Sequence, residues 1–443
     1  MTTRFRLLAA LALGLSLVTG CDSLTDGPDA SAVASASASD WRSDVLAEAD
    51  GLDPLGLIDL YVSFAPGTDP EAESDAMFDG HDVRRRGYVQ ETNPGVAIRL
   101  SLLDLNTILG ILGLNPLVVD VEIDLAIPLE PFPDSYVPLS DRYTGRERDV
   151  LIAQTTQPGD FEGQMLPWSV RQVRGHLSST ASGDGAGTID VDVYVIDSGV
   201  DHPDVNVVES VAFLDEGAAA GPTTHGNHVA GIIGATDDDG GMVGVAPGVR
   251  IHSLDVFDAS GTTSMSQVLR AVDHVTAAKR ANPSAPVVVN MSLGARTSTT
   301  ELNALDRAIQ TSIRAGVIYV VSAGNDGVNA AYVSPARVPE VITVGAYDSR
   351  WQFASEFSNY GSVVDLLAPG VRVVSGADGG QYARLDGTSM AAPHVTGAAA
   401  LNVAQRPSAK PKHVETQLWR RGRSLGQGVP SGTTTRSVWV GTM

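Results

Sequence analysis

A serine near the end of the chain stands where a nucleophile could work. Ser389 lies in LDGTSMAAPHVTGAAALNVA, residues 385–404, in which a Gly-Thr-Ser turn leads into small residues that predict a tightly packed helix. A helix N-terminus carries unpaired N–H groups and the positive end of the dipole, which favour the charge that develops when a serine oxygen attacks a carbonyl. A lone Gly-Thr-Ser favours the alternative, a simple helix cap. Catalysis therefore requires a base, an orienting acid and an oxyanion donor elsewhere in the chain.

An acid and a base precede this serine in the sequence. Asp197 follows the apolar run 191–196 and begins an Asp-Ser-Gly turn, although such a turn is also ordinary loop chemistry. His225 opens HGNHVAG, residues 225–231, and could act as a general base. The competing interpretation is a metal pair of His225 and His228, but a helical zinc motif needs histidines four residues apart and a glutamate. We therefore expect His225 to be the base and His228 to be a packing residue.

An asparagine is the candidate oxyanion donor. Asn325 lies in SAGND, residues 322–326, directly after the apolar run 317–321. Its side-chain amide could donate to an oxyanion, whereas the alternative is an asparagine that only shapes a turn. Pro393 follows Ser389 in the predicted helix, and we expect an early turn to tolerate its missing N–H.

The elements that must position these residues follow an α/β rhythm from about residue 165 to residue 443. Short β-branched runs alternate with helical stretches. The runs are 191–196, 287–290, 317–321 and 341–344, and the helical stretches include 263–280 and 300–314. Continuous apolar strands between helices predict a parallel sheet covered on both faces. Ligands bind such sheets beyond the carboxyl ends of the strands, where Asp197 and Asn325 lie.

The composition predicts a globular, exported protein. The chain has 443 residues, of which 43% are hydrophobic, enough for a large core in two or three domains. Its formal charge is −22 and it has no long Lys/Arg run, which argues against nucleic acid or anionic lipid as the main partner. Arg4 and Arg6 precede a short apolar run at 7–18, which is the pattern of a signal peptide.

The only cysteine of the sequence, Cys21, ends the run Leu-Val-Thr-Gly-Cys. This run resembles the lipobox of bacterial lipoproteins, which implies a signal peptide at 1–20 and a lipid anchor on Cys21. A cysteine that falls there by chance is the alternative. With a single cysteine, the fold contains no intramolecular disulfide.

Four segments follow the signal peptide. Residues 21–54 are rich in Ser, Ala and Asp, which predicts a flexible tether. Residues 55–130 predict a small α+β domain without an obvious catalytic group, with strands at 61–64 and 117–127 and a helix after Asp104. Residues 131–164 are rich in Pro, Gly and Asp, as in an exposed, cleavable connector. Residues 165–443 are the α/β domain.

Five motifs carry a resemblance to a known family. DSGV, HGNHVAG, NMSLG, SAGND and GTSMAAPHV, in this order, resemble the subtilisin-like serine proteases (peptidase S8), and the proteinase K branch is the most similar along 334–370. The resemblance covers roughly 165–443, and 55–130 resembles the family's inhibitory prodomain, of the inhibitor I9 type and ferredoxin-like fold. It implies a parallel sheet with helices on both faces. The order Asp, His, Ser is that of subtilisin.

The resemblance implies a role for each candidate residue. Ser389 matches the nucleophile, His225 the base, and Asp197 the carboxylate that orients the imidazole. Asn325 matches the oxyanion-hole amide, which acts together with the backbone N–H of Ser389. Gly261 matches the edge that pairs with extended substrate. Two segments match the walls of the S1 pocket, namely Ser292, Leu293 and Gly294, and Ser322, Ala323 and Gly324.

The resemblance implies no cofactor for catalysis, but it does imply a structural calcium site. The carbonyls of Pro339 and Val341 and the carboxylate of Asp365 match its ligands, and oxygen ligands suit this ion. A surface turn acid is the alternative for Asp365. The chain also departs from the family's usual HGTHVAG, because Asn227 replaces the threonine, and this leaves substrate preference near the histidine open.

These features predict a serine endopeptidase made as a self-processing zymogen. Its own prodomain would inhibit it, proteins or peptides would be its substrates, and Cys21 would be its only link to a membrane. We expect an exported monomer that is cleaved between about 131 and 165. Cleavage would leave the catalytic domain either held at the membrane by the prodomain or released to the periplasm or medium. The alternatives are acyl transfer to an amine and an inactive, peptide-binding relative.

Overall fold

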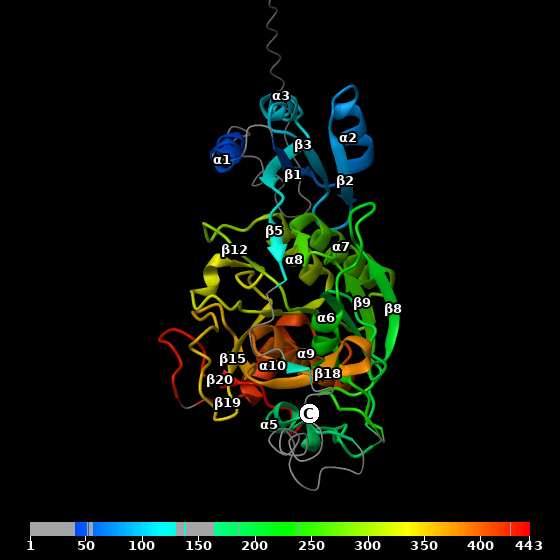
Figure 1. Ribbon diagram of the computed structural model, residues 1–443, viewed down its shortest axis with the longest axis vertical. Helices are drawn as coiled ribbons and strands as arrows, with labels where there is room; N and C mark the ends of the chain where they lie inside the picture. Colours follow the sequence, from blue (N-terminus) through cyan, green and yellow to red (C-terminus); the bar gives the residue numbers. More distant parts are fainter. Residues whose placement is uncertain are drawn as a thin grey trace, which may run out of the picture.

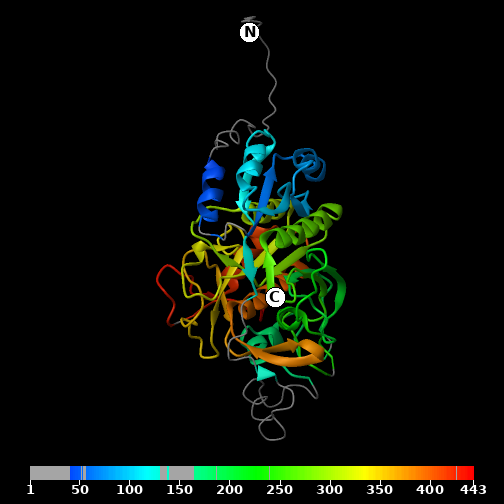
Figure 2. The ribbon, with the colours of Figure 1, turned by 45° about the horizontal axis from the view of Figure 1, so that its top comes forward.

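The computed structural model describes residues 40–50, 52, 56–129, 137–138, 164–185, 187–238, 240–425 and 427–443. The predicted signal peptide, Cys21 and most of the predicted connector therefore lie outside the described residues. An N-terminal domain of residues 56–129 sits on a larger C-terminal domain that begins at residue 164 (Figures 1 and 2). Within the described ranges, no helix is both long and apolar enough to cross a membrane.

The C-terminal domain is built on a mainly parallel sheet, as the apolar runs predict. In the described part of the chain this sheet has nine strands in the order β19-β20-β16-β15-β13-β11-β7-β9-β8. Only the short pair β19 and β20 is antiparallel. The strands are β7 (Asp192–Asp197), β8 (Val207–Ala212), β9 (Arg250–Asp255), β11 (Val287–Met291), β13 (Ile318–Ser322), β15 (Ile342–Tyr347), β16 (Leu366–Pro369), β19 (Arg423–Ser424) and β20 (Arg436–Ser437).

Helices cover both faces of this sheet, because its strands are apolar on both sides. The helices of this domain are α5 (Trp168–Gln172), α6 (Thr224–Gly234), α7 (Met265–Ala281), α8 (Ala304–Ala315), α9 (Thr388–Gln405) and α10 (Pro411–Arg421), with 3-10 turns η1 (Gly175–Leu177), η2 (Ala330–Tyr332) and η3 (Asp378–Gly380). Minor sheets pair β10 (Thr262–Ser264) with β5 (Ala126–Pro128), β12 (Ala295–Arg296) with β14 (Val333–Ser334), and β17 (Val373–Ala377) with β18 (Gln381–Leu385) and β6 (Val137–Pro138).

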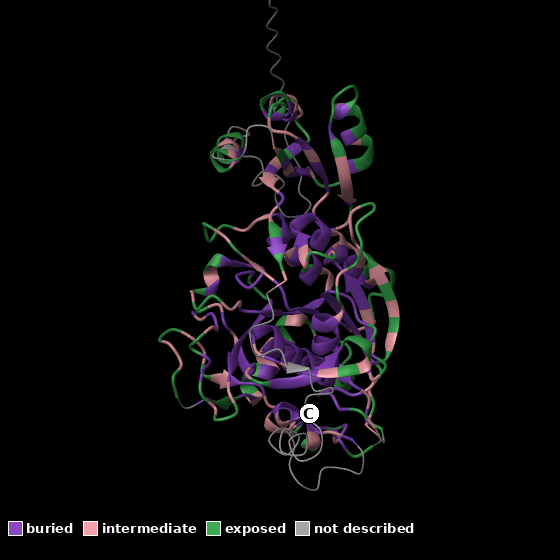
Figure 3. Ribbon diagram, viewed as in Figure 1, coloured by how far each residue is buried: buried purple, intermediate pink, exposed green. Residues whose placement is uncertain are grey.

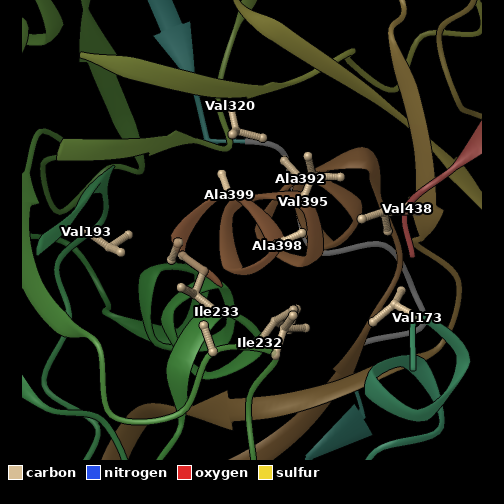
Figure 4. Packing of buried hydrophobic residues seen from close by; sticks show 14 of the residues in the cluster. Val173, Val193, Ile232, Ile233, Val320, Ala392, Val395, Ala398, Ala399 and Val438 are labelled. Carbon is tan, nitrogen blue, oxygen red and sulfur yellow. The ribbon is translucent and has the colours of Figure 1, made fainter. Parts of the chain in front are cut away.

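Helix α9 runs through the core, where purple marks buried residues in Figure 3. Its alanines pack against α6 and the strands around Val193 and Val320 (Figure 4). Small side chains are required there, because a Cβ added at Gly397 would lie 2.7 Å from Cβ of Val245. Dense packing on all sides fixes the position of the helix and therefore of its N-terminus.

The N-terminal domain is an α+β unit, as its sequence predicts. Its antiparallel sheet has the order β2-β3-β1-β4 and carries two helices, a ferredoxin-like arrangement. The elements are β1 (Leu57–Phe64), α2 (Pro70–Phe78), β2 (Arg84–Val89), β3 (Gly95–Ser101), α3 (Leu105–Leu112) and β4 (Val118–Ile123).

Two expectations for this region were wrong in detail. Part of the expected tether is helical, α1 (Asp40–Ala49), because Trp41 and Val45 lie one turn apart and are buried in the core of the N-terminal domain. The strand expected over 117–127 is interrupted at Asp124 and Leu125. Its first half, β4, stays in the sheet of the N-terminal domain, whereas β5 pairs with β10 of the C-terminal domain.

A histidine between two carboxylates lies on strand β9. His252 Nδ1 is 2.6 Å from Glu209 Oε2, and its Nε2 is 2.9 Å from Asp192 Oδ1. Ionised carboxylates only accept hydrogen bonds, so these two contacts favour the imidazole form in which both ring nitrogens carry a proton and the ring is positively charged. Burial opposes that charge, but the hydrogen bonds to Asp192 and Glu209 raise the pKa of His252 above its ordinary value.

Candidate active site

The candidate nucleophile lies at the start of α9. Ser389 is the second residue of this helix and its side chain is buried. Its backbone N–H is among the first four of the helix, which have no partner within it. The hydroxyl of Ser389 donates to the carbonyl of Ser292 at 3.2 Å. Catalytic hydrogen bonds often reach their final geometry only when substrate is bound, so this rotamer fits a resting site.

The hydroxyl of Ser292 replaces a hydrogen bond that Pro393 cannot make. Pro393 is the sixth residue of α9, and an N–H there would donate to the carbonyl of Ser389. Ser292 Oγ donates to that carbonyl instead, at 2.9 Å, and accepts from Asn290 Nδ2 at 2.9 Å. The proline is thus tolerated through a buried side chain, and the explanation from an early turn was wrong. Thr396 closes the network by donating to Asn290 Oδ1.

The predicted acid and base are in contact. His225 Nδ1 lies 2.7 Å from Asp197 Oδ1, and the two side chains are 5% and 0% exposed. Strand β7 ends at Asp197, and His225 lies in the first turn of α6. The helix can approach the turn after β7 because residue 226 is glycine, and a Cβ there would collide with the carbonyl of Gly199. A carboxylate on Nδ1–H fixes the tautomer and leaves Nε2 to act as the base.

The amide of Asn325 is oriented by its neighbours. Asn325 Oδ1 accepts from the backbone N–H and the hydroxyl of Thr388, both at 2.8 Å. A backbone N–H can only donate, so the atom that faces it must be the oxygen. The Nδ2 donor therefore points away from Thr388. A Cβ at position 387 would lie 3.3 Å from Nδ2, so the glycine there leaves space for the amide group.

The two segments predicted to line the S1 pocket follow neighbouring strands. Residues 292–294 come directly after β11, residues 322–324 begin at the last residue of β13, and these two strands are paired in register. The sequence analysis missed the residue that holds the second segment. Asn359 is fully buried, donates to the carbonyl of Ala323, and accepts from the N–H groups of Asp326 and Val328.

The other polar residues of the HGNHVAG motif are structural. His228 Nε2 lies 3.1 and 3.2 Å from the carbonyls of Val373 and Ala383, and burial lowers the pKa of His228 to about 3. A buried neutral imidazole fits the predicted packing role. Asn227 uses both ends of its amide, because its oxygen accepts from the N–H of Asp201 and its nitrogen donates to the Asp201 carboxylate. The departure from threonine therefore shapes the loop after Asp197.

The predicted substrate edge pairs with the N-terminal domain. Strand β5 runs antiparallel to β10, and Leu129 N–H donates to the carbonyl of Gly261 at 2.7 Å. Gly261 has φ of +75°, a conformation that favours glycine. Pairing of an extended segment with an exposed strand edge is how β-augmentation binds peptides.

Two carboxylates of the N-terminal domain meet helix N-termini of the C-terminal domain. Asp124 accepts from the N–H and the hydroxyl of Ser266, at 2.8 and 2.7 Å, at the start of α7. Glu122 accepts from Ala304 N–H at 2.9 Å, at the start of α8, and pairs with Arg307. Burial raises the pKa of Asp124, and burial raises that of Glu122 to about 7 although Arg307 opposes the shift.

A turn of the N-terminal domain also surrounds a carboxylate of α7. Asp273 accepts from the backbone N–H groups of Gln90, Glu91 and Thr92, at 3.0, 2.7 and 2.8 Å. Arg86 adds a pair with Asp215, at 2.6 Å. Charge-assisted hydrogen bonds of this kind are roughly twice as strong as neutral ones, so the two domains are held by charge as well as by β5.

The three residues predicted to bind calcium lie on two segments, with Pro339 and Val341 just before β15 and Asp365 directly before β16. Asp365 Oδ2 accepts from Thr343 N–H at 2.9 Å, and burial, with Glu415 nearby, raises the pKa of Asp365 to about 7. Glu340, between Pro339 and Val341, has a left-handed φ of +75°. Carboxylate and carbonyl oxygens are donors that suit a hard cation. Among the described residues, no group of three or more His, Cys, Asp or Glu side chains could hold a metal ion.

Known proteins are similar to this chain in sequence. The chain is 41% identical over 283 residues to an extracellular serine proteinase of Thermus sp. (strain Rt41A), covering 62% of this chain and 64% of that protein. It is 34% identical over 312 residues to an alkaline protease of Alkalihalobacillus alcalophilus, covering 69% of this chain and 78% of that protein. The chain thus spans less than two thirds of the Thermus relative.

A solved structure is similar in fold as well as in sequence. The crystal structure of a cold-adapted subtilisin-like serine proteinase has a TM-score of 0.52 and 35% identity, and the match covers 62% of this chain and 97% of that one. Residues 188–431, more than half of the chain, match the subtilase family, peptidase S8. The C-terminal domain has the subtilisin-like α/β fold, and the chain belongs to the subtilase family.

Proposed function

We propose that the protein is a serine endopeptidase that forms an acyl-enzyme on Ser389. The observation that carries this proposal is the buried hydrogen bond between Asp197 and His225, next to the packed helix α9 that has Ser389 in its first turn. The relatives named as serine or alkaline proteases support the same chemistry.

The geometry supports a role for each residue. His225 Nε2 takes the proton of the Ser389 hydroxyl as Oγ attacks the substrate carbonyl, and Asp197 stabilises the imidazolium that forms. The oxyanion of the tetrahedral intermediate accepts from Asn325 Nδ2 and from the backbone N–H of Ser389. His225 then donates its proton to the leaving amine, and a water molecule repeats the sequence to release the acid.

We propose that peptide substrates bind along the same strand edge. Strand β10 and Gly261 offer backbone groups for an extended chain, which β5 uses here. Apart from Leu293, the residues of segments 292–294 and 322–324 are Ser, Ala or Gly, so we propose an S1 pocket that accepts apolar or aromatic residues.

Labelling with a fluorophosphonate probe tests the nucleophile. The processed protein should be labelled, and Ser389→Ala should abolish the label. Casein hydrolysis should be lost in the same variant, and addition of an amino acid amide separates hydrolysis from acyl transfer. An absence of Ser389-dependent label on folded, processed protein would refute the proposal and favour a peptide-binding relative.

We further propose that residues 55–130 are an inhibitory prodomain, which is cut from the catalytic domain between about 131 and 165. Support comes from β5, which occupies the substrate edge, and from the carboxylate contacts of Asp124 and Glu122. Sequencing the N-terminus of purified protein and of Ser389→Ala tests self-processing. Identical full-length products would contradict it, whereas a new N-terminus only in the wild type is expected.

The proposed localisation is that of an exported lipoprotein precursor. It rests on the lipobox-like sequence that ends at Cys21 and on the extracellular name of the Thermus relative. Palmitate labelling of the wild type, absent in Cys21→Ala, tests the anchor. Fractionation with antibodies to each domain shows whether the catalytic domain stays on the membrane or is released.

We also propose a place in the proteinase K branch and, with it, a structural calcium ion held by Pro339, Val341 and Asp365. The ion would relieve the cost of ionising Asp365 and would take no part in the reaction. Chelation should lower the melting temperature of the wild type and leave that of Asp365→Asn unchanged. An equal response of both proteins would contradict this assignment.

A further inference from the structure

A second carboxylate lies beside Asp197. Strands β7 and β9 are parallel neighbours, and their register pairs Asp197 with Asp255. Paired residues on neighbouring strands lie about 5 Å apart and share a face of the sheet. Val195 and Ile251, on the same face, belong to the core cluster that includes α6. Asp255 therefore lies on the side of the sheet that carries His225.

The carboxyl of Asp255 packs between the turn after β7 and the start of α6. A Cβ built at Gly199 would lie 3.6 Å from Asp255 Cγ and 3.3 Å from Thr223 Cγ2. Thr223 is the residue before α6, two positions from His225. Asp255 is only 7% exposed, and its Oδ1 accepts from Phe257 N–H at 3.2 Å.

The charged side chains that face Asp255 do not offset its negative charge. Strand β7 contributes Asp197, strand β8 contributes only the register partner Ala212, and α6 contributes His225. In the turn after β9, Asp258 is engaged by Ser260 and Thr262. The Oδ2 atom of Asp197 is buried without a hydrogen-bond partner in the described part of the structure.

Two adjacent buried carboxylates repel each other, so the second proton is held more tightly. Burial, and then the charge of Asp197, raises the pKa of Asp255 to about 6. Above that pH the carboxylate of Asp255 carries a negative charge. The positive charge that forms nearby during the reaction is the imidazolium of His225.

We propose that Asp255 is a positioning residue of the active site, which acts through His225 by favouring its charged imidazolium form. The proposal rests on the proposed hydrolytic function. The proposed mechanism assigns this role to Asp197 alone, and Asp255 adds a second negative charge in the same water-poor environment.

Two consequences distinguish this role from a structural one. Removing the charge should shift the acid limb of the kcat/KM profile to lower pH by about 0.5–1 unit, because His225 would protonate less readily. It should also lower the plateau at high pH about 3- to 10-fold, because the imidazolium is less stable in the transition state. A packing defect would lower the plateau without moving the limb.

The test compares processed wild type, Asp255→Asn and Asp255→Glu with a neutral peptide substrate between pH 5 and 10. The Asn variant keeps an oxygen that can accept from Phe257 N–H, and the Glu variant keeps the charge. Asp255→Ser supplies a second neutral side chain should the Asn variant not fold. Asp192→Asn is the matched control, because Asp192 lies five residues earlier on β7, roughly 16 Å away.

The expected result is a shifted limb in the neutral variants and an unshifted limb in Asp255→Glu and Asp192→Asn. Limbs that coincide within 0.2 pH unit in wild type and neutral variants would overturn the proposal. A wild type that hydrolyses no peptide at any pH would instead refute the proposed function, so the two failures are distinguishable.

Discussion

Replacing Ser292 with alanine tests whether a side chain stands in for the N–H that Pro393 lacks. The hydroxyl bonds two buried groups, the carbonyl of Ser389 and the amide of Asn290. Leaving a buried polar group unpaired costs about 1–3 kcal/mol, so the loss of both bonds should destabilise the fold by about 2–6 kcal/mol. In a Pro393→Ala background, the new backbone N–H of residue 393 can donate to the Ser389 carbonyl. The destabilisation caused by Ser292→Ala should then be smaller by about 1–3 kcal/mol.

The assay is a double-mutant cycle in guanidinium chloride. All four proteins carry Ser389→Ala to prevent autolysis, and this change leaves the backbone carbonyl in place. Ser358→Ala serves as the control, because its hydroxyl bonds Ala346 and Asn359 and should add to Pro393→Ala within about 0.5 kcal/mol. An equal cost of Ser292→Ala in both backgrounds would refute the reasoning.

Three further outcomes are expected. The pKa of His252 is raised in the folded protein, so His252 stabilises the protein below about pH 6.5. This stabilisation is lost as the pH rises through the folded pKa. The difference in unfolding free energy between wild type and His252→Gln should therefore shrink from about pH 6 to about pH 9. Arg337→Met should cost about 3–5 kcal/mol in denaturant unfolding, since it removes the cationic partner of the fully buried Asp306, and an unchanged midpoint would contradict this. Asp273→Asn should weaken the hydrogen bonds between residue 273 and the backbone of residues 90–92 by about 1–2 kcal/mol. The purified N-terminal fragment should therefore inhibit the processed Asp273→Asn protein roughly 5- to 30-fold less strongly than it inhibits the processed wild type.

The positions of the candidate catalytic residues could be predicted because strand ends and helix starts are local features. Asp197 and Asn325 follow apolar runs that are strands β7 and β13, and His225 and Ser389 open helices. The direct contact of Asp197 with His225 depends on the close approach of α6 to the turn after β7, which Gly226 permits.

Partners that are distant in the sequence could not be predicted. Asn359 lies 36 residues from the carbonyl that it holds, and no spacing indicates that contact. The same is true of Ser292, which lies 97 residues before the carbonyl that it bonds. Helix α1 was not predicted for another reason. The residues before it are small and polar, so Trp41 and Val45 did not form a recognisable apolar pattern.

The interruption at Asp124 and Leu125 makes the N-terminal domain a bivalent ligand. One attachment is the pairing of β5 with β10, and the other comprises the carboxylate contacts of Glu122 and Asp124 with α8 and α7. When two weak contacts are joined by a short rigid link, release of one leaves the other at a high effective concentration, so it rebinds before the ligand escapes. Cutting the chain between the contacts, at residues 124–125, would lose this avidity, whereas cutting beyond residue 130 preserves it. The position of the cleavage would then decide whether the N-terminal domain dissociates from β10 after the cut or stays bound until it is itself degraded.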